Sequence, residues 1–472
     1  MSRVGSGGGI AGLTLAAAIH KHAPADAPVE VNIYEADSEV RTAGAGITVW
    51  PRTWDVMREL GLYDALSAVA VKSSSTSTSG NEVELKPAFV ARKANQPTKG
   101  FNYGYVYAPT GSTTMHRRDM IDVFLQNLPS SYRLHTSKRL KSYTTRPRSP
   151  TSQSETVITL QFADGTTAEA DVLVGADGIH SATRCAMYAQ AHERECVPQG
   201  ADESRWQNCD RCRAAEPVWT GVHSYRCLIP TEELYALNPK HTTATIGSIL
   251  CHIITYQISG GKFLNFVALC REPKGEGSPY VGPWVTGVPR EEVLSKFALW
   301  EPEVQQMLQC VRNPTRWAIH VVDKLPFAVR DNVALVGDAM HAMPPNFGAG
   351  GGQAIEDAYI LGCSLAARTT ATRAHIPAVL RTYEQIRLPF TRDVARRARE
   401  VGLMYEFNAP GYYSAADGEG VPETETETDK EGRARLEALG EAIRDMWGWQ
   451  WKEDAFVWAD PARNVEARDA GI

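Results

Sequence analysis

Apolar and polar positions alternate with two different periods along the first 130 residues of the chain. Residues 29–34 (VEVNIY) switch at every position, which predicts a strand. Residues 51–68 instead place Trp54 and Met57 near helical spacing, and residues 116–128 predict another helix. Strands interleaved with helices are typical of an α/β layer, so we expect the chain to begin with one.

The middle of the chain is richer in strand signals. Residues 133–143 and 156–162 predict strands, Ala163-Asp164-Gly165 predicts a tight turn, and residues 147–154 predict a loop insertion. Between residues 218 and 269, short alternating runs predict a mainly antiparallel sheet. We expect this sheet to form a separate domain that interrupts the α/β layer.

An α/β pattern returns after Asp331, with an apolar strand at residues 333–336, a glycine-rich loop and a helix from about Ala354. We therefore predict an α/β protein with an interrupted first domain, an antiparallel-sheet domain and a helical C-terminal segment. The expected boundaries are 1–72, 110–190 and 327–400 for the first domain, 73–109 and 216–326 for the sheet domain, 187–215 for an insertion, and 401–472 for a helical or irregular C-terminal segment with an acidic linker at 422–433.

Composition narrows the classes of function. Apolar residues make up 43% of the chain and charged residues 22%, as in ordinary globular proteins. The net charge of −6 argues against nucleic-acid binding, and the lack of a run of about 18 apolar residues argues against a membrane span. Nine cysteines, an odd number, and an N-terminus without a secretory signal favour reduced thiols in the cytoplasm. The oligomeric state cannot be inferred from these features.

The segment GGGIAG at residues 7–12 matches G-x-G-x-x-G and precedes a helix-prone run. Gly7, Gly9 and Gly12 allow a tight turn and close approach of the backbone to a pyrophosphate, which the helix N-terminus stabilises. Glu35 ends the next strand, where a carboxylate accepts hydrogen bonds from ribose hydroxyls. The strand expected before the loop is short and polar, and a glycine-rich turn without a ligand is the alternative. We favour a Rossmann-like dinucleotide site.

Two further segments end an apolar strand in an acid. Residues 171–178 (DVLVGADG) place Asp177 and Gly178 after one strand, and residues 333–338 (VALVGD) place Asp338 after another. The second segment continues through a proline-rich turn into a glycine-rich loop and a helix. Ligands of open α/β sheets bind at the carboxyl ends of the strands, so we expect these acids and the first loop to converge on one site.

These three motifs, in this order, resemble the group A FAD-dependent aromatic monooxygenases of the para-hydroxybenzoate hydroxylase type, and most closely the fungal salicylate-hydroxylase-like and phenol-dearomatising enzymes. The resemblance covers residues 4–400. It implies tightly bound, non-covalent FAD, NAD(P)H as a transient reductant, capture of O2 as a flavin C4a-hydroperoxide, and oxygen transfer to a small phenolic or aromatic acid substrate. The choice between NADH and NADPH stays open, as does that between hydroxylation, decarboxylation and dearomatisation.

The resemblance also implies cofactor contacts. Gly7, Gly9 and Gly12 would hold the pyrophosphate and Glu35 the adenosine ribose. Further contacts are implied for Arg41, Ala45, Gly46, Arg117, Asp177, Gly178, Asp338, Gly350 and Gly351. The last two would approach the flavin ring with backbone amides, where a helix start stabilises negative charge on the reduced ring.

Some of these residues also fit simpler roles. Asp338 is compatible with a helix cap, and Arg117 with a surface position at a helix start. We expect His341, which follows the third motif, to pack or hydrogen-bond structurally rather than to titrate in catalysis.

The strand YRCLIP that contains Arg226, together with Tyr256, resembles the active-site segments of the phenol-dearomatising enzymes. We expect Arg226 to bind a phenolate or carboxylate of the substrate and Tyr256 to orient it. Deprotonating a phenol of pKa about 10 at pH 7 costs about 4 kcal/mol, and a nearby guanidinium lowers such a pKa by about 1–3 units. The alternative is a structural arginine stacked on an aromatic ring. Cys227, Gln257 and Asn346 depart from the family pattern, which leaves the substrate undefined.

Cys209 and Cys212 form a C-x-x-C, half of the paired motif that zinc sites usually contain. No second C-x-x-C is present, so we expect free thiols in an exposed insertion and no metal site.

Two other functions are compatible with the motifs. An FAD-dependent epoxidase would act on an alkene, and a non-catalytic flavin- or nucleotide-binding scaffold would not turn over. Substrate profiling separates the first from a ring hydroxylase. Bleaching of a yellow protein by NAD(P)H excludes the second, because only a redox-active flavin responds in this way.

Overall fold

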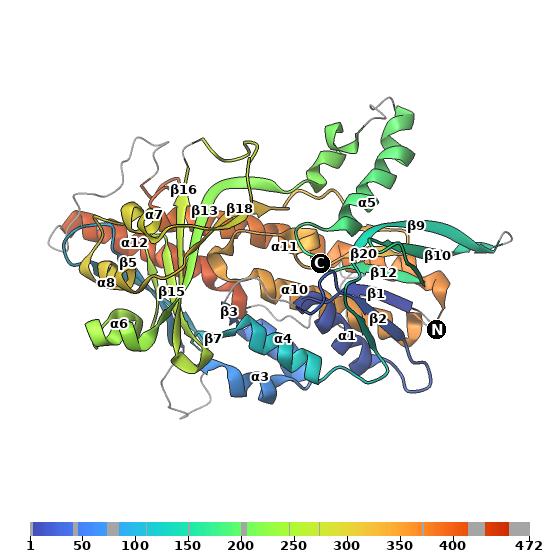
Figure 1. The fold of residues 1–472 in the computed structure, drawn as a ribbon, viewed down its shortest axis with the longest axis horizontal. Helices are drawn as coiled ribbons and strands as arrows, with labels where there is room; N and C mark the ends of the chain where they lie inside the picture. The colour runs from blue at the N-terminus through green and yellow to red at the C-terminus, as the bar shows by residue number, and fades with distance from the viewer. Residues whose placement is uncertain are drawn as a thin grey trace.

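The structure of the protein is a computed structural model. It describes residues 3–40, 46–72, 85–109, 111–149, 152–199, 205–244, 246–272, 274–370, 372–413 and 430–452. Two large sheets lie side by side along the long axis of the molecule, and the long helix α11 runs between them (Figure 1).

The first large sheet is the predicted α/β layer. Its six strands follow the order β19-β20-β12-β1-β2-β8, and all neighbours are parallel except β19 and β20. The short first strand forms despite its polar sequence, because parallel neighbours hydrogen-bond to it on both sides. The strands are β1 (Arg3–Gly7), β2 (Glu30–Tyr34), β8 (Arg133–His135), β12 (Val172–Gly175), β19 (Val329–Arg330) and β20 (Val333–Leu335).

Helices α1 (Ile10–His22) and α10 (Gly350–Ala366) pack against each other beside this sheet. The two helices approach so closely that a Cβ at Gly362 would lie only 2.6 Å from the Cβ of Ala18, so the packing requires glycine at this position. Helix α10 begins at Gly350, four residues before the helix start expected near Ala354. The glycine-rich loop is therefore partly the first turn of the helix, and its amides lie at the helix N-terminus.

The second large sheet contains the predicted antiparallel strands, in the order β17-β18-β13-β16-β15-β14-β5-β6. All its neighbours are antiparallel except β14 and β5. Helices α6 (Thr231–Leu237), α7 (Arg290–Lys296) and α8 (Pro302–Cys310) pack against it. Its strands are β5 (Lys86–Lys93), β6 (Phe101–Ala108), β13 (Val218–Pro230), β14 (Gly247–Leu250), β15 (Ile253–Ile258), β16 (Phe263–Arg271), β17 (Val285–Gly287) and β18 (Thr315–Val321).

Two smaller three-stranded sheets complete the strands. One is formed by β3 (Gly46–Val49), β7 (Thr113–His116) and β4 (Val71–Lys72). The other is formed by β9 (Leu140–Ser149), β10 (Ser152–Phe162) and β11 (Thr167–Ala170). The loop insertion predicted at residues 147–154 is wrong, because β9 and β10 pair as a hairpin through most of this segment.

Two predicted helices also differ in detail. The helix expected at 51–68 is two helices, α2 (Pro51–Glu59) and α3 (Tyr63–Val69), because Gly61 between them has φ +74°, which ends a right-handed helix. The helix expected at 116–128 is α4 (Arg117–Gln126), whose first turn is capped by the side chain of His116.

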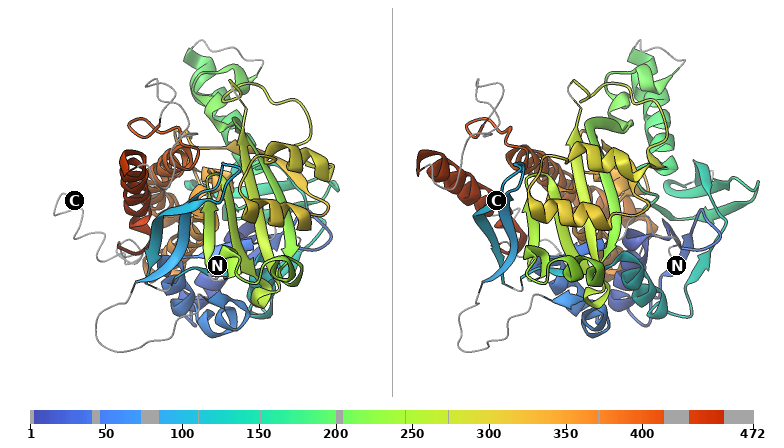
Figure 2. Two further views of the ribbon diagram at one scale, coloured as in Figure 1. Left: turned by 90° about the vertical axis from the view of Figure 1, so that its left-hand side faces the viewer. Right: turned by 60° about the vertical axis from the view of Figure 1, so that its left-hand side comes forward.

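The predicted helical C-terminal segment is confirmed. Helix α11 (Ile376–Tyr405) extends across the expected boundary at residue 400, and α12 (Lys430–Trp447) and α13 (Trp449–Lys452) follow. Helix α12 lies beside β6 of the antiparallel sheet (Figure 2), and a Cβ at Gly440 would lie 2.5 Å from the carbonyl oxygen of Tyr103. Of the expected acidic linker, residues 422–429 lie outside the described residues.

Helix α5 (Ala182–Ala191) carries the predicted insertion away from the first large sheet (Figure 1). Among the described residues, no helix has both the length and the apolar character needed to cross a membrane.

Candidate active site

A cavity of about 1040 Å³ lies between the two large sheets. One side is formed by the carboxyl ends of β1, β12 and β20, and the other by residues of β13, β15 and β16. Its volume is at the upper end of the range for small-molecule and cofactor sites, and its position is that of ligands in open α/β sheets.

The first glycine loop lies at the cavity. A Cβ at Gly7 would lie 2.7 Å from the carbonyl oxygen of Ala176, so close strand packing requires glycine there. Among the described residues, a Cβ at Gly9 would meet no atom within 4 Å, so they leave open space in front of the loop. Gly9 is the N-cap of α1, and no side chain caps this helix. The amides of the first turn are thus available to an anion, and the helix dipole favours negative charge there.

Glu35 follows β2 and lines the same part of the cavity. Its carboxylate lies against Gly8, where a Cβ would be 2.6 Å from Oε2. The Asp37 amide donates a hydrogen bond of 3.0 Å to Oε1 of Glu35, which fixes the side chain beside the glycine loop.

Asp177 and Gly178 follow β12 and also line the cavity. The carboxylate of Asp177 accepts hydrogen bonds from the backbone and side chain of Thr183, both at 2.9 Å, and from the hydroxyl of Ser181. Asp177 therefore holds the turn that leads into α5. Gly178 adopts φ +73°, a conformation that glycine tolerates at little cost.

Asp338 is the first residue of α9 (Asp338–His341), three residues after the end of β20, and its side chain is exposed at the cavity wall. Gly350 and Gly351 form the first turn of α10, which has no side-chain cap. A Cβ at Gly350 would meet no atom closer than the Cγ of Met343 at 3.8 Å. This second helix N-terminus therefore also faces open space.

A buried charged network holds the start of α10 in place. Asp357 accepts hydrogen bonds from Arg387 at 2.7 Å and from the Gly337 amide at 3.0 Å, and its Oδ2 lies 2.6 Å from Nε2 of His341. Burial alone would raise the pKa of Asp357, but the charges of His341 and Arg387 hold it below its ordinary value. Arg387 also pairs with Glu356, which pairs with Arg52. His341 thus has the structural contact expected for it.

Arg226 and Tyr256 lie on the other side of the cavity, on β13 and β15. The Nε of Arg226 donates to Ser224 at 3.0 Å, and its guanidinium lies 4.6 Å from the centre of the Trp317 ring. Among the described residues, this is the one hydrogen bond of the Arg226 side chain. Burial lowers the pKa of Arg226 to about 10, and the nearby charge of Arg117 acts in the same direction. Arg226 therefore remains a cation at neutral pH.

Tyr256 is enclosed by the cavity walls. Burial raises the pKa of its phenol, although the charge of Arg226 partly offsets this effect, so Tyr256 is a neutral hydrogen-bond donor at pH 7. The backbone of Gly46 lies against it, since a Cβ at Gly46 would be 2.8 Å from the Tyr256 hydroxyl oxygen. Gly46, which was expected to lie along the cofactor, thus also makes room for a residue of the opposite sheet.

Aromatic side chains from distant segments complete the cavity. Trp447 of α12 contacts Trp50, Phe89 and Phe347, with ring centres 5.0, 5.7 and 5.3 Å apart. Its indole N–H donates to the Tyr405 hydroxyl at 2.8 Å. This aromatic wall is not predictable from the sequence, because no local motif links the C-terminal segment to the cavity.

The structure brings most of the predicted site residues to one cavity. Gly12 differs because it is buried within α1 rather than in the cavity wall, and Arg41 and Ala45 lie outside the described residues. The predicted residues that line the cavity are Gly7, Gly9, Glu35, Gly46, Arg117, Asp177, Gly178, Arg226, Tyr256, Asp338, Gly350 and Gly351.

The residues present fit a flavin dinucleotide. Two uncapped helix N-termini face one open space, and a carboxylate beside the first of them suits a ribose. A parallel sheet with this loop and an antiparallel sheet across the cavity define an FAD-binding enzyme of two-sheet architecture.

Comparison with known proteins assigns the family. The model of the FAD binding domain family matches residues 6–202 and 317–398, more than half of the chain. The chain belongs to this family and is an FAD-dependent aromatic monooxygenase. The family expected from the motifs is thereby confirmed.

Similar proteins support this assignment along most of the chain. Salicylate hydroxylase of Pseudomonas putida is 30% identical over 95% of this chain and 91% of its own length. The 6-methylsalicylate 1-monooxygenase atA of Aspergillus terreus is 33% identical over 85% of this chain and 82% of its own. A solved salicylate hydroxylase substrate complex is 28% identical, covers 97% of both chains and has a TM-score of 0.72.

Proposed function

We propose that this enzyme uses NAD(P)H and O2 to hydroxylate a small phenolic or aromatic acid substrate that is bound by Arg226. The observation that carries the proposal is the position of this guanidinium: it lines the cavity across from the glycine loops, and among the described residues its side chain donates a single hydrogen bond. A cytoplasmic location, in which the nine cysteines stay reduced and without disulfides, is part of the proposal.

FAD, when bound, supplies the redox chemistry that joins the reductant to O2. Gly7 and Gly9 would hold its pyrophosphate at the N-terminus of α1, and Glu35 its ribose. Gly350 and Gly351 would place their amides at the flavin ring. The helix dipole of α10 then favours negative charge on that ring, and the buried Asp357–Arg387 pair keeps this helix start in place.

Arg226 would make the substrate both bound and reactive. A guanidinium matches a carboxylate with two parallel hydrogen bonds, and it also favours the phenolate form of a bound phenol. Lowering the pKa of the phenol by about 1–3 units recovers about 1.4–4 kcal/mol of its deprotonation cost at neutral pH. An electron-rich phenolate ring accepts electrophilic oxygen more readily than the neutral ring does. The contact with Trp317 holds the guanidinium without using its terminal N–H groups.

Tyr256 and the aromatic wall would orient the ring. Because its pKa is raised, Tyr256 can donate a hydrogen bond to a phenolic or carboxylate oxygen of the substrate at neutral pH. Trp50, Phe89 and Trp447 offer apolar surface against which a substrate ring can pack. The same surface excludes water, which limits side reactions at the flavin.

The substrate class also draws on the similar proteins. Two of them act, by name, on salicylate and on 6-methylsalicylate, and both compounds combine a phenol with a carboxylate. Such a pair of groups suits the half-buried guanidinium of Arg226 beside the neutral phenol of Tyr256. We therefore place hydroxybenzoic acids first among the substrates.

The test is turnover across a substrate panel. FAD-loaded enzyme is given NADH or NADPH with a salicylate, matched phenols that lack the carboxylate, matched benzoates that lack the hydroxyl, and an alkene. We expect nicotinamide consumption coupled to a product heavier by one oxygen atom, or to a decarboxylated product, for compounds with a phenolic hydroxyl.

Product mass and H2O2 decide the outcome. If nicotinamide is consumed with every compound but all the oxygen appears as H2O2, the substrate class is wrong although FAD is bound. Epoxidation of the alkene without attack on any phenol would replace ring hydroxylation by the epoxidase alternative.

A further inference from the structure

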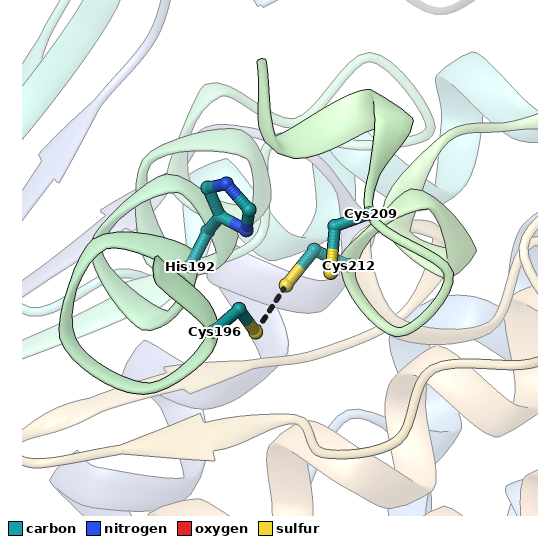
Figure 3. A group of neighbouring side chains, drawn as sticks. All are labelled: His192, Cys196, Cys209 and Cys212. Carbon is teal, nitrogen blue, oxygen red and sulfur yellow. Dashed lines mark hydrogen bonds between the residues drawn. The ribbon is translucent and has the colours of Figure 1, made fainter. Parts of the chain in front are cut away.

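A second cluster of chemically reactive side chains lies outside the cavity, in the insertion between α5 and β13. His192 and Cys196 are the ends of η1 (His192–Cys196), a π-helical turn that continues α5. Cys209 directly follows the short 3₁₀ turn η3 (Trp206–Asn208), and Cys212 is the first residue of a second one, η4 (Cys212–Ala215). Figure 3 shows the four side chains directed toward one another from these two segments.

The distances match those of ligands around one metal ion. The imidazole nitrogen and the three sulfurs all lie within 4.8 Å of one another, and the sulfurs of Cys196 and Cys212 are 3.7 Å apart. Two thiolates about 2.3 Å from a tetrahedral zinc ion are separated by about 3.8 Å. A disulfide needs sulfurs about 2.05 Å apart, so this pair has the spacing of shared ligands rather than of a bond.

The surroundings also suit thiolate ligands. Cys196 and Cys212 are buried, with 8% and 0% of their surface exposed, and His192 is 2% exposed. The backbone N–H groups of Arg211 and Cys212 hydrogen-bond to the Cys209 sulfur, and the Arg211 side chain hydrogen-bonds to the Cys196 sulfur. Three thiolates, one neutral imidazole and a divalent cation carry a net charge of −1, which these donors and the Arg211 cation stabilise.

We propose that His192, Cys196, Cys209 and Cys212 form a structural binding site for Zn²⁺ or a similar thiophilic divalent cation. Four protein ligands leave no open position for water or substrate, which is the property of structural rather than catalytic zinc. None of the four ligands lines the cavity. Three thiol protons are released when the ion binds, and no electron is transferred.

The ion would tie together two segments that border the active site. Upstream of the ligands, Thr183 at the start of α5 lines the cavity. Downstream, β13 carries Arg226. The insertion is also joined to β19 of the first large sheet by Arg330, which pairs with Glu195 at 2.6 Å. It is joined to the first turn of α5 by Arg184, which donates to the Ala215 carbonyl at 2.8 Å. Metal binding therefore stabilises a segment that connects the two sheets.

The sequence favours free thiols in an exposed insertion with no metal site, whereas in the structure Cys196 and Cys212 are buried and lie with His192 and Cys209 in one cluster. The other half of the proposed site has the spacing His-x-x-x-Cys, which a C-x-x-C pattern does not match. On the π-helical turn this spacing brings the two side chains to one face, and such turns are frequent at functional sites.

Metal content tests the proposal directly. The full-length, FAD-loaded enzyme is purified without chelator and with a thiol reductant, and its zinc is measured per chain. We expect one zinc ion per chain, released by a thiol-blocking mercurial and not by dialysis. Replacement by Co²⁺ should give the strong visible d–d bands and the near-ultraviolet thiolate charge-transfer band of a tetrahedral sulfur site.

Two substitutions locate the site. Cys209→Ser should weaken Zn²⁺ binding by about 100-fold or more, since even the loss of a group that hydrogen-bonds to a metal ligand costs about 10–100-fold. Cys185→Ser is the matched control, because Cys185 lies on α5 outside the cluster, and this variant should keep its zinc. The Co²⁺ spectrum of the unmodified chain gives a readout even if Cys209→Ser folds poorly.

Several results would overturn the proposal. One is a reduced enzyme that carries no zinc and gives no thiolate band with Co²⁺. Another is a Cys196–Cys212 disulfide that excludes metal until it is reduced and leaves the reduced chain without affinity for Zn²⁺. Equal zinc loss in both serine variants would place the ion elsewhere. These measurements do not use turnover, so their outcome tests the metal site independently of the proposed substrate.

Discussion

The two sides of the cavity are built in different ways. The side toward the parallel sheet presents mainly backbone: glycines at strand ends and two uncapped helix N-termini. The side toward the antiparallel sheet presents side chains, with Arg226 and Tyr256 from its strands and Trp447 from the C-terminal helix. A surface made of backbone suits a cofactor that a whole family shares. A surface made of side chains can be altered by single substitutions, so the substrate can change while the fold stays the same.

This difference also governs what a mutation does. A side chain added to the backbone side enters space reserved for the cofactor, so it should affect FAD before it affects folding. A side chain removed from the other side should affect substrate while FAD stays bound.

The largest effect is expected for Arg226→Met. Removing one partner of a buried charge pair costs about 2–5 kcal/mol, so kcat/KM for a hydroxybenzoate should fall about 30-fold or more. Flavin content should be unchanged, as measured by absorbance after purification. Arg226→Lys keeps the positive charge but loses the planar guanidinium, so its kcat/KM should lie between those of the unmodified enzyme and Arg226→Met. Unchanged kcat/KM in the Met variant would leave Arg226 the structural role that its contact with Trp317 also suggests.

The contact between the end of α11 and the antiparallel sheet should be sensitive to acid. Glu406 follows α11 and binds Arg271 of β16 at 2.6 Å and His252 at 2.9 Å. Burial raises its pKa, but these two partners outweigh burial and lower it from 4.5 to about 2. Because the folded pKa is below the unfolded one, this stabilisation is present above pH 4.5 and is lost as the pH falls toward 2.

Glu406→Gln tests the contribution of this contact to stability. The free energy of unfolding at pH 7 should fall by about 3 kcal/mol, and the difference from the unmodified chain should shrink as the pH falls below 4.5. Denaturant titrations at several pH values measure it. Glu400→Gln is the control, because Glu400 forms a pair with Arg396 in which both side chains are exposed. A difference that stays constant with pH would rule out Glu406 as the source.

A smaller effect is expected for Gly9→Ala. The added Cβ meets no protein atom within 4 Å, so unfolding of the FAD-free chain should change by less than about 0.5 kcal/mol. FAD affinity should nevertheless fall about tenfold or more, equal to about 1.4 kcal/mol, in a flavin fluorescence titration. Gly287→Ala, in equally open space on β17 but outside the cavity, is the control and should bind FAD normally. Normal FAD affinity in Gly9→Ala would move the pyrophosphate away from this loop.

The smallest effect is expected for Trp447→Phe. The change keeps an aromatic ring but removes the hydrogen bond to Tyr405, worth about 1 kcal/mol. We expect KM for the substrate to rise by about fivefold, with FAD content unchanged. Trp300→Phe is the control and should leave KM unchanged, because Trp300 packs against the core beside the antiparallel sheet and does not line the cavity. A loss of FAD in place of the change in KM would assign the C-terminal helix to the backbone side of the site.

Local pattern was sufficient for much of the fold. Strand β2, helix α4 and the antiparallel nature of the second sheet followed from periodicity, because one face of each element is buried. The glycine loop and the two strand-end acids located the parallel side of the cavity in advance. Periodicity failed at residues 147–154, where the sequence is polar throughout and shows no alternation although β9 and β10 pair there, and within 51–68, where Gly61 splits one expected helix into two.

The sequence by itself determined the side of the cavity toward the parallel sheet. A glycine that lets the backbone approach a phosphate acts through its immediate neighbours in the chain, so a local motif reveals it. Only the tertiary structure decided what lies opposite. Trp447 reaches Phe89, and Cys196 reaches Cys212, through contacts between separate segments, and no local spacing encodes such contacts. Side chains that meet across a cavity or around an ion are brought together by the packing of whole elements, so their partnership becomes visible only in the folded chain.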